Sequence, residues 1–124
     1  MEGLKELFAD IQTKNTAISP REARQMMKES NEFVLLDVRT PQEYNQIRID
    51  GAKLIPVDEL AVRAPAELPD KHIPVLVYCH SGARAGTAVK SLRQMGYENA
   101  FSFGGILNWP YETVKEGEIK VENF

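Results

Sequence analysis

The chain of 124 residues has one cysteine, Cys79, and two histidines, His72 and His80. A single cysteine excludes an intramolecular disulfide and leaves no second thiol in the chain to resolve an oxidised Cys79. These three side chains are also too few to build a zinc site of the usual cysteine or histidine type. We therefore expect no metal and no cofactor, and sulfur chemistry at Cys79 must involve an external partner.

The sequence also lacks a basic excess and a long apolar run, and its first residues are not expected to form a secretory signal. Its net charge is −3, which argues against a general nucleic-acid binder because phosphate contacts need a basic surface. No apolar run approaches the roughly 20 residues that span a bilayer. The start, MEGLKELFADI, has early acidic residues instead of the apolar centre of a secretory signal. We expect a cytoplasmic protein with no nucleic-acid or membrane partner.

The composition and patterning are those of one globular domain, with 27% charged and 43% hydrophobic residues. Continuous apolar runs at 33–36 and 75–78 predict buried strands. Ser19, Pro20 and Glu22 form the signature of a capped helix start. The other expected helices are an amphipathic one at 2–14 and those at 20–28, 41–44, 57–63 and 84–95. Short strands are expected at 16–18 and within 51–56, a last strand at 100–103, and a strand or helix remnant after 112. Pro65 and Pro69 are expected to interrupt the chain.

Strands that alternate with helices predict a three-layer α/β domain with a mostly parallel central sheet and helices on both faces. We expect this domain to occupy residues 16–124, preceded by a helical extension at 1–15. In such sheets ligands bind beyond the carboxyl ends of the strands. Cys79 follows one buried run and the Asp37-Val38-Arg39 segment follows the other, so both are expected to line one crevice.

The environment of Cys79 predicts an activated sulfur. The cysteine joins a buried strand to a small-residue loop, after which a helix presents Ala85, Ala88, Val89, Leu92 and Met95 on one face. Backbone N–H groups from 80 through 85 and the positive end of this helix then face the sulfur. We expect Cys79 to be present as thiolate near neutral pH and to be a nucleophile.

Four motifs give the chain a resemblance to the single-domain rhodaneses, which are sulfurtransferases. The motifs are LLDVRTPQEY (35–44), DGAKLIP (50–56), VYCHSGARA (77–85) and GGILNW (104–109). The resemblance covers residues 18–109 and implies a rhodanese-like fold. It also implies that Cys79 takes a sulfane sulfur from a donor such as thiosulfate, holds it as a persulfide, and passes it to cyanide, a thiol or an acceptor protein in a ping-pong reaction.

The resemblance further implies that the active-site loop consists of His80, Ser81, Gly82, Ala83, Arg84 and Ala85. Arg84 stands at a family arginine position, where it stabilises either loop carbonyls or the anionic donor, or is instead a solvated charge. His80 is either a substrate contact or a rim residue. The four residues between Cys79 and Arg84 match the sulfurtransferase loop, whereas the related cell-cycle phosphatases have one more residue.

Three further positions are expected to support the site. Asp37 is expected to accept hydrogen bonds from backbone or arginine, and Arg39 to pair with Glu43. The family usually has Gly-His-Ile where this chain has Ile47-Arg48-Ile49, which places Arg48 at the rim. Ala85 also replaces a common serine or threonine.

The sequence leaves other functions open. The main alternative is a persulfide carrier or regulatory interaction module that docks through the helix at 2–14, which could equally pack on its own domain or form a dimer contact. The least favoured is a phosphatase or arsenate-reductase activity, because the loop is short and no second cysteine is present. The physiological donor and acceptor are not specified by any of these patterns.

Overall fold

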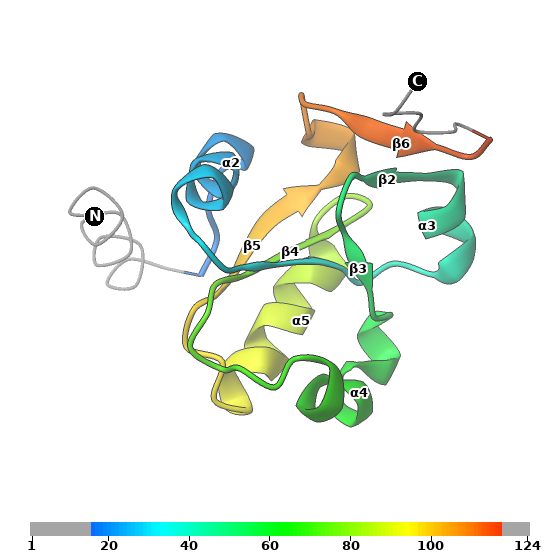
Figure 1. The fold of residues 1–124 in the computed structure, drawn as a ribbon. Coiled ribbons are helices and arrows are strands. Elements are labelled where there is room, and N and C mark those ends of the chain that lie inside the picture. Colours follow the sequence, from blue (N-terminus) through cyan, green and yellow to red (C-terminus); the bar gives the residue numbers. More distant parts are fainter. Residues whose placement is uncertain (1–15, 118–124) are drawn as a thin grey trace, which may run out of the picture.

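A computed structural model describes residues 16–117 and builds them around a parallel four-stranded sheet with the order β3-β1-β4-β5 (Figure 1). The strands are β1 (Val34–Asp37), β3 (Lys53–Leu54), β4 (Val75–Cys79) and β5 (Ala100–Gly105). All five residues of β4 are buried, because helices cover both faces of this central strand. The expected strand at 16–18 is reduced to one bridge between Ala17 and Ser102 beside β5.

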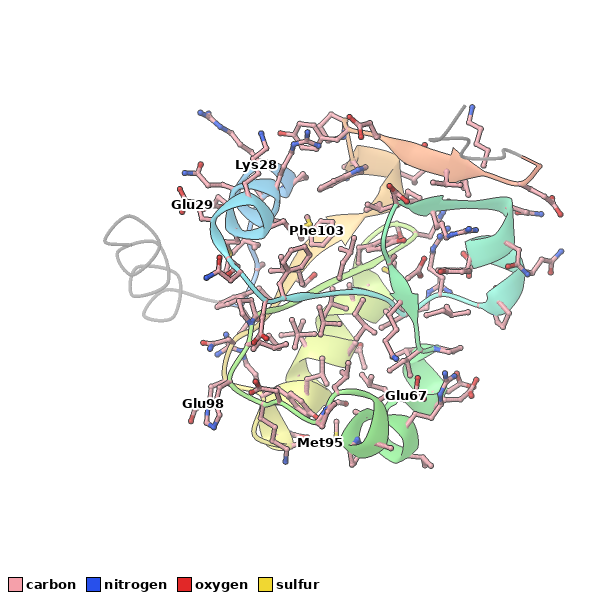
Figure 2. All side chains as sticks on the ribbon, in the orientation of Figure 1. Lys28, Glu29, Glu67, Met95, Glu98 and Phe103 are labelled. Carbon is pink, nitrogen blue, oxygen red and sulfur yellow. The ribbon has the colours of Figure 1, made fainter. Side chains whose placement is uncertain are left out.

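Helices pack on both faces of the sheet, which confirms the predicted three-layer α/β fold (Figure 1). The described helices are α2 (Pro20–Glu29), α3 (Pro41–Gln46), α4 (Leu60–Glu67), α5 (Ala83–Gln94) and the 3-10 turns η1 (Val57–Glu59) and η2 (Ile106–Asn108). One core lies against α4 and α5, and the other against α2, where Figure 2 shows Phe103 between the helix and the sheet.

Local sequence signals explain where several helices begin and end. Ser19 Oγ accepts from the Glu22 N–H at 3.0 Å while the Glu22 carboxylate accepts from the Ser19 N–H at 2.9 Å, which is the predicted capping box of α2. Thr40 and Glu43 repeat this arrangement at the start of α3. Gly96 has a φ of +100° after the last turn of α5, as expected of a left-handed helix terminator.

The prediction that Pro65 interrupts the chain is wrong, because Pro65 lies inside α4. Its ring removes a single helical hydrogen-bond donor. Burial of Leu60, Ala64 and Leu68 holds the helix in place around it. The Tyr97 hydroxyl also hydrogen-bonds to the Ala64 and Leu68 carbonyls, at 3.1 and 2.6 Å. Tertiary packing therefore outweighs the local preference, and α4 continues to Glu67.

A second, two-stranded sheet lies beside the carboxyl ends of the main strands (Figure 1). It pairs β2 (Ile47–Ile49) with β6 (Thr113–Lys115) in antiparallel register. The sequence predicted no strand at 47–49, and the expected remnant after residue 112 is β6. The expected helix at 2–14 lies outside the described residues.

Residues 16–117 contain neither a membrane-crossing helix nor a cluster of metal-binding side chains. Between residues 16 and 117, no helix has the length and apolar character needed to cross a membrane. Across the same range, no three His, Cys, Asp or Glu side chains gather in a way that could hold a metal ion.

Candidate active site

Cys79 is the last residue of β4 and lies opposite Gly105 of β5. Its residue surface is only 1% exposed, and its Sγ accepts a hydrogen bond from the Gly82 N–H at 3.0 Å. The chain can turn back toward the sulfur because Gly82 adopts a φ of +121°, after which α5 begins at Ala83. The sulfur is therefore held at the start of a helix, where backbone dipoles favour negative charge.

The rest of the loop divides into an exposed rim and a buried base. His80, Ser81 and Ala83 are exposed, whereas Ala85 is buried in the core beneath the loop. A serine or threonine hydroxyl at position 85 would need a buried partner, so alanine suits this packing. Of the predicted loop, Gly82 contacts the Cys79 sulfur through its N–H, whereas Ala83, Arg84 and Ala85 already belong to α5.

Gly105 of β5 allows the backbone of the Cys79 loop to approach this strand closely. A Cβ on Gly105 would overlap the His80 carbonyl group and the Ser81 Cα. The Leu107 N–H also donates to the His80 carbonyl at 3.3 Å. Neighbouring Trp109 is buried against Phe103, with ring centroids 5.2 Å apart, and so serves in packing.

Replacing Gly105 with alanine is expected to destabilise the fold by about 1–3 kcal/mol, since a methyl group forced against backbone cannot be relieved by a rotamer change. The displaced loop should also expose Cys79 to faster alkylation by iodoacetamide. Gly86→Ala is the matched control, because a Cβ on this helical residue meets no atom within 4 Å. Urea unfolding of both variants tests the prediction, and equal stabilities would contradict it.

Arg84 is fixed by an ion pair that the sequence did not reveal. Its two terminal nitrogens donate to the two carboxylate oxygens of Glu43 in α3, at 2.7 and 3.0 Å. The hydrogen bonds with Arg84 hold the pKa of Glu43 at about 2. The predicted Arg39–Glu43 pair is wrong, because the α3 helix turns Glu43 toward the loop of α5 instead.

This ion pair is expected to stabilise the protein only while Glu43 is ionised. Because its folded pKa of about 2 lies below the ordinary 4.5, the contribution is present above pH 4.5 and is lost as the pH falls toward 2. Between pH 4.5 and pH 2 the free energy of unfolding of Glu43→Gln should therefore fall by about 1 kcal/mol less than that of the wild-type protein, after allowance for solvent screening. Unfolding free energies of both proteins across this pH range test the prediction, which parallel curves would contradict.

Arg39 instead pairs with Asp37 inside the protein, where the two residues are 2% and 0% exposed. Arg39 donates through Nε and a terminal nitrogen, the latter at 2.7 Å, and its backbone N–H donates to the same carboxylate at 2.9 Å. Burial opposes the charge of Arg39, but hydrogen bonding and attraction to Asp37 outweigh it and raise its pKa. As predicted, Asp37 accepts both arginine and backbone hydrogen bonds.

The pair also connects the main sheet to the smaller one. Arg39 donates to the Ile47 carbonyl at 2.6 Å, and the Tyr78 hydroxyl accepts from the Ile49 N–H at 3.1 Å. Burial and the negative charge of Asp37 raise the pKa of Tyr78, so this hydroxyl stays neutral. The strand that ends in Cys79 is thus connected to β1 and β2 by buried polar groups.

Comparison with known proteins agrees with this geometry: the rhodanese-like domain family matches residues 19–111. The chain belongs to the rhodanese-like domain family. Thiosulfate sulfurtransferase PspE of Escherichia coli is 38% identical over 80 residues, which cover 64% of this chain and 77% of PspE. A solved structure described as a rhodanese with anions from E. coli superposes with a TM-score of 0.64 at 36% identity, covering 68% of this chain and 99% of that one.

A longer relative contains a similar segment. The probable adenylyltransferase/sulfurtransferase MoeZ of Mycobacterium tuberculosis is 36% identical over 98 residues. The match covers 77% of this chain but only 25% of MoeZ, so the chain spans about a quarter of the length of that protein.

Arg48, which was predicted to lie at the rim of the site, packs on a neighbouring helix. Its guanidinium lies over the Tyr44 ring, 4.7 Å from the centroid, and a terminal nitrogen is 3.4 Å from the Tyr44 carbonyl. Arg48 belongs to β2, and these contacts hold its side chain against α3. A direct role at the rim of the Cys79 loop stays a prediction.

Proposed function

We propose that this rhodanese-like domain is a sulfurtransferase whose nucleophile is Cys79. The observation that supports the proposal most directly is the position of the sulfur at a strand end, with the Gly82 N–H donating to it at 3.0 Å. Such an environment favours an anionic sulfur both before and after a sulfur atom is added. Relatives named as sulfurtransferases give independent support.

The reaction uses two displacements at sulfur. The Cys79 thiolate attacks the outer sulfur of thiosulfate, the sulfur–sulfur bond of the donor breaks, and its electron pair leaves with sulfite. The resulting Cys79 persulfide is again an anion that loop N–H groups can stabilise. A thiol or cyanide then attacks the outer sulfur of the persulfide and regenerates the thiolate, so the kinetics are ping-pong.

Intact-protein mass spectrometry tests this function. Incubation with thiosulfate should add the mass of one sulfur atom, and subsequent cyanide should remove it and form thiocyanate. Absence of the adduct over a range of thiosulfate concentrations, or an adduct that cyanide cannot remove, contradicts the proposal.

Transfer to a protein acceptor is a second candidate, favoured by an exposed apolar side chain beside the Cys79 loop. Cys79 is 1% exposed, while Leu107 beside its loop is 66% exposed and offers an apolar contact at the rim. A docked protein thiol could use such a contact, whereas cyanide gains nothing from it. Leu107→Ser should leave thiosulfate-to-cyanide turnover unchanged and slow transfer to a protein acceptor; equal effects on both would contradict this candidate.

A further inference from the structure

The charge of Arg84 is directed into a carboxylate instead of the crevice. Arg84 lies in the first turn of α5, two residues after Gly82, whose N–H donates to the Cys79 sulfur at 3.0 Å. Its guanidinium nevertheless makes a two-point ion pair with Glu43, at 2.7 and 3.0 Å. An unpaired arginine here would attract an anion to the sulfur, but the paired one presents little net charge.

Glu43 is held in the orientation that makes this pairing possible. The Thr40 backbone N–H and hydroxyl both donate to its Oε1, at 3.0 and 3.1 Å, as part of the cap of α3. The same oxygen accepts from Arg84. The start of α3 therefore holds the Glu43 carboxylate in the position where Arg84 binds it.

A second arginine near the strand ends, the buried Arg39, is neutralised in the same way. Arg39 forms a buried ion pair with Asp37, at 2.7 Å. The two arginine–carboxylate pairs together contribute no net charge. Beside these two pairs, the sulfur is contacted by the Gly82 N–H and lies at the start of α5, and both supply only partial charges to an anionic donor.

From this arrangement we propose that Glu43 sets the donor-charge preference of the site by holding and neutralising Arg84. The inference rests on the proposed sulfurtransferase function and names its favoured donor class: singly charged persulfides of organic or protein thiols, over dianionic thiosulfate. A net positive charge near the sulfur would stabilise a dianion about twice as much as a monoanion, because Coulomb energy scales with the charge. Cancelling that charge removes the advantage of thiosulfate.

The favoured first step is balanced without any further reactant. The Cys79 thiolate attacks the outer sulfur of a persulfide R–S–S⁻, and a new sulfur–sulfur bond forms. The old bond breaks and its electron pair leaves with R–S⁻. One negative charge remains on the Cys79 persulfide and one on the released thiolate, and no oxidant or reductant is consumed.

Glu43→Gln separates the charge of this residue from its structural role. Glutamine also serves at the third position of a capping box, so α3 keeps its cap. The matched control is Glu67→Gln on α4, where Figure 2 labels Glu67. This variant causes the same change in net charge and weakens a comparable pair with Arg63. Both variants lose one carboxylate, but only the first leaves a cation beside Cys79.

Alkylation of Cys79 by iodoacetate and iodoacetamide tests the charge at the sulfur without any sulfur transfer. The ratio of the anionic to the neutral reagent rate should rise roughly two- to fivefold in Glu43→Gln. It should stay at the wild-type value in Glu67→Gln, and the effect should be absent when Glu43→Gln is combined with Arg84→Gln. An unchanged ratio in Glu43→Gln, or an equal rise in Glu67→Gln, overturns the inference.

Sulfur loading then tests the donor preference itself. In Glu43→Gln the KM for thiosulfate should fall roughly four- to 25-fold, the square of the monoanion effect, while the KM for the persulfide of 2-mercaptoethanol, which carries a single negative charge, falls only about two- to fivefold. Equal changes for both donors overturn the inference even if the sulfurtransferase function stands. Failure of wild-type protein to take sulfur from either donor overturns the proposed function, whereas the alkylation ratio remains an independent measure of the charge.

Discussion

Cys79→Ser is expected to lower sulfur uptake from thiosulfate by at least about a thousandfold. A serine hydroxyl fits the same position and can accept the Gly82 hydrogen bond, but it is not ionised near neutral pH and is a poor nucleophile toward sulfur. Cys79→Ala should behave in the same way. The measurement is intact mass after donor exposure, together with the rate of thiocyanate formation.

The interpretation depends on both variants being folded. Cys79 is buried, so each replacement is compared with wild type by urea unfolding before activity is measured. A folded Cys79→Ser protein that gains the same sulfur adduct as wild type would show that another group carries the sulfur. Such a result would remove Cys79 from the proposed reaction.

Asp37→Ala is expected to reduce the free energy of unfolding by about 3–5 kcal/mol. The substitution leaves the Arg39 guanidinium buried without its carboxylate, and Arg39 is only 2% exposed. A single domain has a total stability of about 5–15 kcal/mol, so a large part would be lost. Urea or thermal unfolding measures the effect directly.

A double variant shows whether the destabilisation comes from an unpaired buried charge or from lost side-chain packing. Asp37→Leu combined with Arg39→Met replaces the ion pair with apolar side chains and should be more stable than Asp37→Ala alone, because no buried charge is left unpaired. If the free energy of unfolding of Asp37→Ala lies within about 1 kcal/mol of the wild-type value, water or another acceptor binds the Arg39 guanidinium, and the buried charge is not left unpaired.

Much of the site could be predicted because its determinants are local in sequence. The apolar run before Cys79, the small residues after it and the helical periodicity that follows define strand, loop and helix within twenty positions. The capping box at Ser19 and the terminator at Gly96 are likewise short-range signals, and both appear in the structure.

The partners of the charged residues could not be predicted, because they depend on how distant elements pack. Arg84 and Glu43 are 41 positions apart, and nothing in either segment identifies the other. The sequence predicted a short helix after Thr40, but not that its Glu43 faces the Cys79 loop. The close approach of Gly105 to His80 is hidden for the same reason, since a double glycine is compatible with many turns.

The pairing of β2 with β6 has a consequence for where this domain ends. The family match stops at residue 111, whereas β6 consists of Thr113–Lys115 and supplies the hydrogen-bonding partner of Ile47–Ile49. A chain shortened after Tyr111 would keep every residue of the Cys79 loop and yet leave one edge of β2 open to pairing with another molecule. Such a protein should self-associate through the exposed edge of β2. A domain boundary chosen from the family match alone would therefore promote aggregation.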